Sequence, residues 1–215
     1  MWEKYFASIP ERYAELFSNC EKVWQPLDRL VDFLNKNIRP IDESVKIGDS
    51  YIGDDVEIGE GTKVEHGAVI YGPTIIGKNC EIRAGAYIRG QVIVGDGSVI
   101  GHSTELIRSI VLDGVHVDHF SYVGDSVLGN GVHFGAGAKI ANLRFDQKNI
   151  VINGADTGRI KLGAVLGDHV QLGVNLALGP GVIMEKDAWL TLPHQLGPGF
   201  YSRQQIQDFI TQKSK

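Results

Sequence analysis

The chain is poor in cysteine, in long apolar runs and in excess positive charge. Its 215 residues include only two cysteines, too few for a disulfide framework and typical of a reducing compartment. No apolar run reaches the roughly 18 residues that a membrane span requires, and the N-terminus lacks the pattern of a secretory signal. The net charge of -5 disfavours nucleic-acid binding, which usually needs a basic face. These absences predict a cytoplasmic protein that binds neither membranes nor nucleic acids.

The strongest positive feature is a ladder of branched aliphatic residues at every sixth position. Its ten members are Ile52, Ile58, Val64, Ile70, Ile76, Ile82, Ile88, Val94, Ile100 and Leu106. Small or β-branched residues stand four places after them, beginning with Val56 and Thr62. A period of six fits neither a helix nor an alternating strand and indicates a parallel β-helix. Three short strands would form each coil of about 18 residues, and the coils would stack as a solenoid.

The hexapeptide register breaks twice. It holds to Leu112, and the next aliphatic frame starts 16 residues later at Leu128, which predicts a loop that bulges from the coil around residues 115–122. The second gap runs for 26 residues from Ile140 to Leu166, and its polar residues 141–162 predict a projecting loop. Loops on a rigid scaffold often carry function, so the site is expected near these two breaks.

Three segments are expected along the chain. Residues 1–40 form a helical segment, 41–192 the β-helix, which begins near Val45, and 193–215 a tail. Ser8 to Glu11 indicates one helix start and Pro26 another, with an end at Pro40. Ser202 to Gln205 indicates a capping box for a short C-terminal helix.

The N-terminal helical segment has two interpretations. It is expected to cover the open end of the solenoid, because terminal repeats need a polar outer face. The alternative is a helix pair that docks a partner, since four aromatic side chains offer apolar area. They are Trp2, Phe6, Trp24 and Phe33.

Three runs downstream carry a more specific resemblance. They are Glu105 to Ser109 with Val117 to Asp125, Gly135 to Arg144, and Thr157 to Gly163. They resemble the acetyltransferase half of the bifunctional enzyme N-acetylglucosamine-1-phosphate uridylyltransferase/glucosamine-1-phosphate acetyltransferase, most closely the variants with a longer loop here. The resemblance covers roughly residues 50–192, and nothing in the sequence resembles the uridylyl-transfer half.

The resemblance implies a left-handed parallel β-helix that assembles as a homotrimer, with each site between adjacent solenoids. It implies an acyltransferase with acetyl-CoA as donor and no metal. The acceptor would be an amino-sugar phosphate such as glucosamine-1-phosphate, or a nucleotide-linked amino sugar.

Individual residues inherit roles from the same resemblance. His119 matches the general base, and an imidazole suits that role because it titrates near neutral pH. Arg89 matches a phosphate ligand, for which a planar guanidinium is well shaped. Tyr122 matches a tyrosine that touches the sugar phosphate, and Glu105 in the first run is assigned to the same substrate side.

The acyl-donor side is expected further along the chain. Ala136 matches a residue whose backbone N–H faces the tetrahedral oxyanion. Asn142 matches an asparagine near acetyl-CoA. Lys148 falls near a loop lysine that reaches the sugar phosphate across a subunit boundary.

Two departures affect the sugar-phosphate pocket. Ile107 replaces a phosphate-binding lysine, and Arg108 beside it should face the other way because adjacent strand residues alternate. His133 replaces an asparagine that holds the sugar. An alternative function is therefore a non-catalytic trimer that serves as scaffold or regulatory partner of a separate sugar nucleotidylyltransferase.

A third hypothesis is a zinc carbonic anhydrase. His66 and His102 lie 36 residues apart, two coils in the expected solenoid, but the match to a zinc-ligand spacing is poor. These two histidines are expected to be surface or inter-subunit residues, as are His116, His133, His169 and His194.

Overall fold

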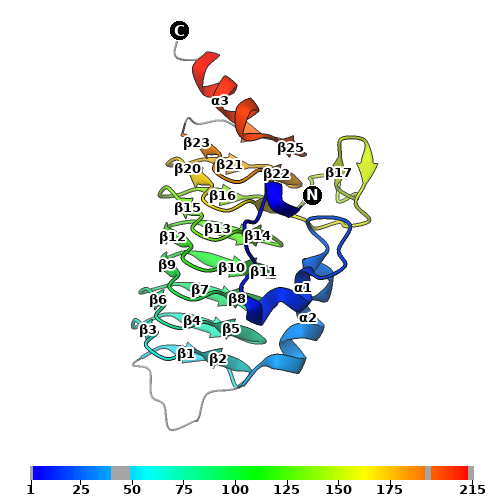
Figure 1. Ribbon diagram of the computed structural model, residues 1–215. Coiled ribbons are helices and arrows are strands. Elements are labelled where there is room, and N and C mark those ends of the chain that lie inside the picture. Colours follow the sequence, from blue (N-terminus) through cyan, green and yellow to red (C-terminus); the bar gives the residue numbers. More distant parts are fainter. Residues whose placement is uncertain (1, 40–48, 192–194, 213–215) are drawn as a thin grey trace.

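The computed structural model describes residues 2–39, 49–191 and 195–212. The central part is a left-handed parallel β-helix whose coils stack along one axis (Figure 1), as predicted. The expected helix end at Pro40, the solenoid start near Val45 and His194 lie outside the described residues.

Three sheets run along the solenoid, and consecutive strands pass from sheet A to sheet B to sheet C. Sheet A consists of β1 (Tyr51–Ile52), β4 (Val69–Tyr71), β7 (Tyr87–Arg89), β10 (Glu105–Ile107), β13 (Tyr122–Gly124), β16 (Lys139–Ile140), β21 (Ala177–Leu178) and β24 (Gln195–Leu196). Sheet B consists of β2 (Val56–Ile58), β5 (Thr74–Ile76), β8 (Val92–Val94), β11 (Ser109–Val111), β14 (Val127–Leu128), β19 (Ala164–Leu166), β22 (Val182–Met184) and β25 (Gly199–Tyr201). Sheet C consists of β3 (Lys63–Val64), β6 (Glu81–Ile82), β9 (Val99–His102), β12 (His116–His119), β15 (His133–Phe134), β20 (Gln171–Leu172) and β23 (Trp189–Leu190).

The aliphatic ladder fills the axis of the solenoid. Its members from Ile70 to Leu106 are completely buried, and the three earlier ones pack against the same core. Hydroxyl and thiol groups at the corners link successive coils. Thr62 Oγ1 accepts from Cys80 N at 2.9 Å, and Ser98 Oγ accepts from Val115 N at 3.1 Å. Burying these polar groups is therefore compensated by hydrogen bonds between coils.

The predicted bulge at residues 115–122 is wrong. These residues form β12 and the start of β13, both paired within their sheets. The register changes earlier, because Tyr87 pairs with Glu105 after 18 residues and Glu105 pairs with Tyr122 after only 17. Two residues separate β7 from β8, whereas Arg108 alone separates β10 from β11. The break is thus a shortened corner, and no loop leaves the coil there.

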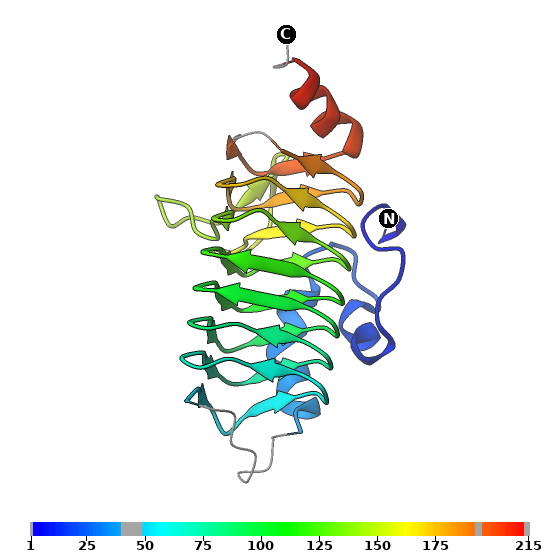
Figure 2. The same cartoon turned by 90° about the vertical axis from the view of Figure 1, so that its left-hand side faces the viewer.

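The gap after Ile140 contains an insertion into one coil. Lys139 pairs with Ala177, 38 residues later, so about one regular coil and 20 further residues lie between them. The insertion carries an antiparallel hairpin of β17 (Val151–Ile152) and β18 (Ala155–Asp156). It extends from the side of the upper coils (Figures 1 and 2). Its apolar residues Ile150, Ile152 and Leu162 are buried, so the insertion folds back onto the body of the protein.

The N-terminal segment is helical but does not lie over an end of the solenoid. It comprises η1 (Trp2–Lys4), η2 (Glu11–Tyr13), α1 (Ala14–Phe17) and α2 (Pro26–Asn37). Its buried side chains pack against the outward-facing aliphatics of sheet B, from Ile75 to Ile183, and it runs along one side of the solenoid in both views. Phe6, Trp24 and Phe33 are each less than 8% exposed. The aromatics that suggested a docking surface are used within the chain.

The capping predictions differ in outcome at the two ends of the chain. Pro26 begins α2, as expected. The turn after Pro10 is a short 3-10 helix without a side-chain cap, and the capping box proposed from Ser8 does not form. Helix α3 (Arg203–Gln212) has the predicted box, because Ser202 Oγ accepts from Gln205 N and Gln205 Oε1 accepts from Ser202 N. Ile206 of α3 is buried in the axial core, so the C-terminal helix closes the upper end. Within the described ranges, every helix is too short or too polar to cross a bilayer.

Candidate active site

The outer face of sheet A gathers three of the predicted substrate ligands. Tyr87, Glu105 and Tyr122 occupy equivalent positions on successive coils. Arg89, at the end of β7, donates from Nη1 to Glu105 Oε1 at 2.6 Å. This hydrogen bond raises the pKa of the Arg89 guanidinium, which keeps its charge. Arg89, Glu105 and Tyr122 therefore form one polar strip across three coils.

A charged network continues this strip at the corner between sheets A and B. Arg108 donates to both carboxylate oxygens of Asp125, at 2.7 and 2.9 Å, and Asn142 Nδ2 donates to the same carboxylate at 2.5 Å. Asp125 is only 2% exposed. Arg108 stands at the corner after β10, and its guanidinium is held by this carboxylate.

Tyr122 joins the polar strip to this network. Burial raises the pKa of its hydroxyl, with smaller contributions from Glu105 and Asp125, while a hydrogen bond from Asn142 opposes the shift. A Cβ on Gly124 would stand 2.7 Å from the Tyr122 hydroxyl and 2.6 Å from Asn142 Nδ2. Only glycine permits this approach, which brings a predicted acceptor ligand next to a predicted donor ligand.

His119 and Ala136 are brought to adjacent coils at the corner between sheets C and A. His119 ends β12 and is exposed, and its carbonyl oxygen accepts from Gly137 N at 2.8 Å. Ala136, the neighbour of Gly137, is therefore stacked one coil above His119. Phe120 lies beside the His119 ring, with centroids 6.5 Å apart, and is 57% exposed. The ring of His119 is accessible at the rim of the solenoid.

A mostly apolar groove of about 710 Å³ adjoins Tyr122. One wall is sheet A of the upper coils, and the other is the first part of the insertion. The lining residues are Tyr122, Lys139, Ala141, Leu143, Arg144, Phe145, Asp146, Ala177, Leu178, Gly179, Pro180 and Pro198. A groove of this size and composition suits an extended, largely apolar ligand with a few polar groups.

Two predicted substrate ligands lie away from this group within one chain. Lys148 is exposed on the insertion, where its backbone N–H donates to Asp146 Oδ1 at 3.3 Å. His133 lies on the outer face of sheet C, beside His116 on the preceding coil. Ile107, where the resemblance expects a phosphate-binding lysine, does lie on sheet A, but it is buried, with only 8% of its surface exposed. A single chain therefore does not unite all the residues that the resemblance assigned to one site.

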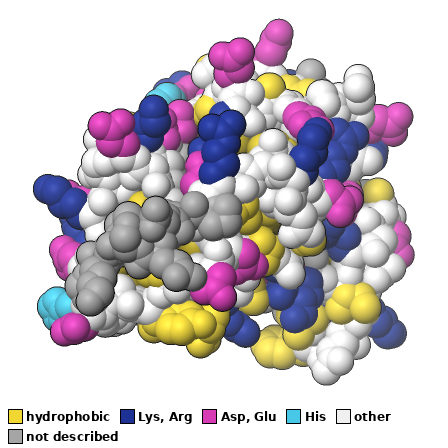
Figure 3. All heavy atoms as spheres, turned by 90° about the horizontal axis from the view of Figure 1, so that it is seen from below, with side chains coloured by type: hydrophobic (Ala, Val, Ile, Leu, Met, Phe, Trp, Pro, Cys, Tyr) yellow, Lys and Arg dark blue, Asp and Glu magenta, His cyan; other side chains and the backbone are white. Residues whose placement is uncertain are grey.

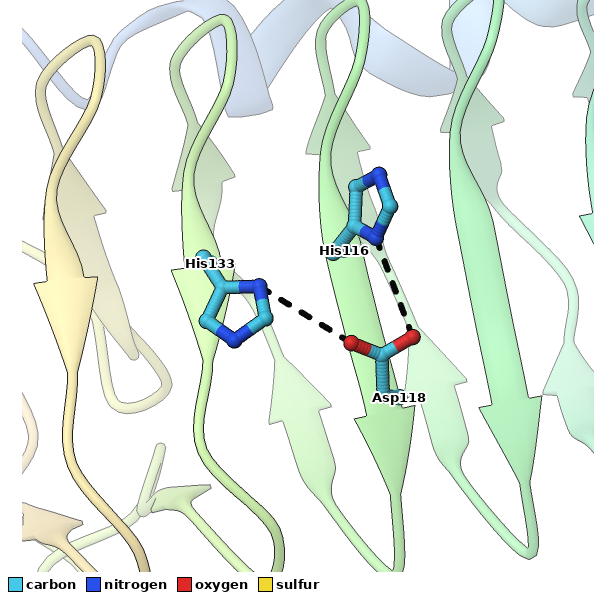
Figure 4. Close-up of side chains that lie close together, drawn as sticks. All are labelled: His116, Asp118 and His133. Carbon is cyan, nitrogen blue, oxygen red and sulfur yellow. Dashed lines mark ion pairs between the residues drawn. The ribbon is translucent and has the colours of Figure 1, made fainter.

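Asp125 and Asp118 organise these contacts but were not singled out from the sequence. His116 Nδ1 and His133 Nδ1 each lie 3.8 Å from an oxygen of Asp118, and both rings face that carboxylate in Figure 4. The available signal was a spacing of 17, which separates Arg108 from Asp125, Asp125 from Asn142, and His116 from His133. Residues at this spacing stack on neighbouring coils once the shortened corner is recognised.

The lower end of the molecule carries charges of both signs. Viewed from below, basic and acidic side chains are interspersed over this face (Figure 3). This mixture agrees with the modest net charge of -5. It gives that face the character of a solvated surface.

Comparison with known proteins matches this solenoid to acetyltransferase-like chains. A bifunctional sugar-1-phosphate nucleotidylyltransferase/acetyltransferase of Sulfurisphaera tokodaii is 42% identical over 161 residues, which are 73% of this chain and 38% of that protein. The bifunctional protein GlmU of Methanocaldococcus jannaschii is 36% identical over 99 residues, covering 44% of this chain and 24% of that protein. The chain thus spans well under half the length of these relatives.

A third relative matches along most of its own length. The putative uncharacterized acetyltransferase YaiX of Escherichia coli K12 is 33% identical over 177 residues, which are 79% of this chain and 74% of that protein. The family model described as the GMPPB C-terminal domain matches residues 70–186, from β4 to the turn after β22. The chain therefore belongs to the family of the GMPPB C-terminal domain.

Proposed function

We propose that the protein is an acyltransferase that moves the acetyl group of acetyl-CoA to the amine of an amino-sugar phosphate, such as glucosamine-1-phosphate, or of a nucleotide-linked amino sugar. The observation that carries this proposal is the stacking of His119 under Ala136 at one corner of the solenoid. The polar strip of Arg89, Glu105 and Tyr122 and the apolar groove lie on sheet A, which begins at that corner. The name of one relative, a bifunctional sugar-1-phosphate nucleotidylyltransferase/acetyltransferase, supports acetyl transfer in the context of sugar phosphates.

His119 would act as general base. Its imidazole takes a proton from the attacking amine, whose nitrogen forms a bond to the thioester carbon. The carbon–sulfur bond then breaks, and the CoA thiolate leaves and receives the proton from the imidazolium. The backbone N–H of Ala136 would donate to the oxyanion of the tetrahedral intermediate. Because the His119 ring is exposed, the amine can reach it without a rearrangement of the solenoid.

Arg89 and Tyr122 would bind the acceptor. The Arg89 guanidinium offers donors that Glu105 leaves free, since only Nη1 bonds to that carboxylate. Glu105 would hold the side chain in position for a phosphate group. Asn142, which bonds to Asp125 and Tyr122 next to the groove, would face the acyl donor.

The proposed assembly is a homotrimer. Lys148 and His133 lie apart from Tyr122 within one chain, and a neighbouring solenoid could bring one of them to each site. Arg89 and His119 from adjacent chains would then share a cleft. A crystal structure of the assembly in which they do not share one would contradict this arrangement.

The reaction is tested by following free thiol with acetyl-CoA and glucosamine-1-phosphate. His119→Ala should lower kcat by about 10²- to 10⁴-fold, the range of general acid–base catalysis. His102→Ala is the matched control, because His102 occupies the same corner one coil earlier and its Nδ1 donates to Ala84 O. It should retain the rate. Thiol release at an unchanged rate in His119→Ala would remove that residue from the mechanism.

A second candidate function is a non-catalytic partner of a sugar nucleotidylyltransferase. It is favoured by Ile107, which is apolar and 8% exposed where the resemblance expects a phosphate-binding lysine. One relative also joins a nucleotidylyltransferase and an acetyltransferase in a single protein. Absence of turnover with amino sugars, together with no acetyl-CoA binding by calorimetry, would favour this function over catalysis.

A further inference from the structure

A cluster on the outer face of sheet C contains His133 but lies apart from Tyr122 of the same chain. His116 and Asp118 come from β12, and His133 comes from β15 on the next coil. One ligand atom from each residue lies within 4.8 Å of the other two. Both imidazoles converge on the carboxylate from neighbouring coils (Figure 4). Two imidazoles and a carboxylate form a donor set that suits zinc and other divalent transition metals.

The distances are close to those of a metal centre. Each histidine Nδ1 lies 3.8 Å from its nearer Asp118 oxygen. With bonds of about 2.0–2.2 Å, two ligands of a tetrahedral ion are about 3.4 Å apart. The two histidine–carboxylate distances exceed this value by a few tenths of an ångström. All three ligand atoms lie within 4.8 Å of one another, so rotation of the side chains would have to close the cluster around an ion. Both histidine side chains are 46% exposed, so small rotations are unobstructed and a fourth position is open to solvent.

The preceding coil packs tightly against the backbone of Asp118. Gly101 stands opposite Asp118 on the preceding coil, where a Cβ would come within 2.5 Å of the Asp118 Cα. Gly135 stands at the equivalent position on the following coil, two residues after His133. Because both flanking positions are glycine, no side chain stacks directly on Asp118, and its carboxylate is contacted by Arg83, His116 and His133. It is only 16% exposed.

Arg83 provides the competing contact. Its Nη1 lies 3.3 Å from Asp118 Oδ1, while its Nε and Nη2 bond to Glu81 at 3.2 and 3.0 Å. Arg83 can therefore release Asp118 and remain paired with Glu81. A divalent cation would replace one weak contact and would not leave a guanidinium without a carboxylate.

We propose that His116, Asp118 and His133 bind one divalent transition-metal ion per chain, with Zn²⁺ as the reference ion. The ion would join β12 to β15 and so cross-link two coils that hydrogen bonds already pair. Because three protein ligands leave one position open, the ion could also hold a water molecule or an external ligand. The proposal does not depend on acyl transfer, since the cluster contains neither His119 nor Ala136.

The test is equilibrium binding of Zn²⁺ to the full chain after treatment with a chelator. The expected result is one ion per chain, with a tetrahedral Co²⁺ absorption spectrum in parallel. His133→Asn and His116→Asn should each weaken Zn²⁺ binding by at least about 100-fold. Substitution of residues that only hydrogen-bond to metal ligands already lowers metal affinity by up to that factor. His66→Asn is the control, because His66 is exposed in the turn between β3 and β4, away from the cluster. Ion binding should also raise the Tm of the wild type.

Arg83→Met separates a metal site from a plain ion-pair cluster. Loss of its guanidinium removes the competitor for Asp118, so Zn²⁺ affinity should rise several-fold. Circular dichroism would verify that each variant is folded. The proposal is overturned if the wild type binds no Zn²⁺ at millimolar concentration, or if the His116→Asn/His133→Asn double variant binds it with unchanged affinity.

Discussion

The early coils repeat every 18 residues, whereas the coils that carry the candidate site repeat every 17. Tyr51 pairs with Val69, and Tyr87 with Glu105, at the longer spacing. Glu105 to Tyr122 and Tyr122 to Lys139 have the shorter one. From Ile70 onward, the axial core is equally buried in both regions. The regions therefore differ at their corners, and the corners determine which side chains meet.

The shortened corner creates a column of polar residues. Arg108 and Asp125 each occupy it with positive φ, 44° and 49°, and Gln91 stands at the equivalent place of the preceding coil, where its carbonyl accepts from Ser109 N. In the 17-residue coils this column holds an ion pair and an amide beside Tyr122. The loss of one residue per coil is thus associated with a charged network that the 18-residue coils lack at this corner in the described residues.

The largest expected effect comes from breaking that network. Asp125→Asn keeps the size and tolerates the positive φ, but leaves the Arg108 guanidinium without its carboxylate. Unfolding free energy should fall by about 3 kcal/mol, the lower end for a broken buried pair, because the Arg108 side chain is 30% exposed. Denaturant unfolding measures it. Gln91→Asn at the same corner should change stability little, and an equal loss in both variants would show that the corners do not differ.

A smaller effect tests whether the axial cores are equivalent. Ile88 in an 18-residue coil and Ile140, which pairs with Val123 at the 17-residue spacing, are both completely buried. Ile88→Val and Ile140→Val should each lower the unfolding free energy by about 1 kcal/mol through loss of one methylene. Denaturant midpoints at constant m-value compare them. If only one of the two substitutions lowered the unfolding free energy, the two regions would differ in their axial cores and not only at their corners.

The third prediction concerns pH and is confined to the 17-residue region. The pKa of Tyr122 is raised above its ordinary value of 10.0, chiefly by burial. The folded state holds this proton more tightly than the unfolded chain, so the contribution to stability is present below pH 10 and is lost as pH rises above it. Tyr122→Phe should show a shallower loss of stability in that range than the wild type. Identical alkaline slopes, measured by denaturation at several pH values, would contradict it.

The smallest effect is expected at a corner of the 18-residue region. Burial raises the pKa of the Cys80 thiol, which favours its neutral form. Its Sγ donates to Gly95 O at 3.2 Å, and Ser98 makes the equivalent bond one coil later. Cys80→Ser should therefore change the unfolding free energy by less than about 1 kcal/mol. Cys80→Ala, which lacks the hydrogen-bond donor, should lower the unfolding free energy more than Cys80→Ser. If Cys80→Ser were the more destabilising, side-chain packing and not the hydrogen bond would determine stability at this corner.

The sequence predicted the solenoid because the axial residues must be aliphatic at a fixed period. It misplaced the first register break because Leu112 is aliphatic for a different reason. Leu112 faces outward and is buried by the N-terminal segment, as Ile110 is. Hydrophobicity alone cannot distinguish an axial residue from one covered by a helix docked on the outside. The position of the N-terminal segment was unpredictable for the same reason.

The site was predictable only where local sequence carried the resemblance. His119 and Ala136 belong to such runs, and the solenoid stacks them. Asp118 and Asp125 acquire their partners from other coils, and their spacing became informative only after the coil length was known. His133 was expected near the sugar, yet its neighbour within the chain is Asp118.

The N-terminal segment ties distant coils together. Arg12 pairs with Glu57 near one end of the solenoid, Lys4 pairs with Glu185 near the other, and Asp168 bonds to the backbone of Tyr5 and Ala7 between them. A stacked solenoid alone has only nearest-neighbour coupling, which allows its ends to fray independently. A segment attached along its length adds long-range coupling. Amide hydrogen exchange in sheet B should therefore occur through one global opening, with similar opening free energies in its end and middle coils.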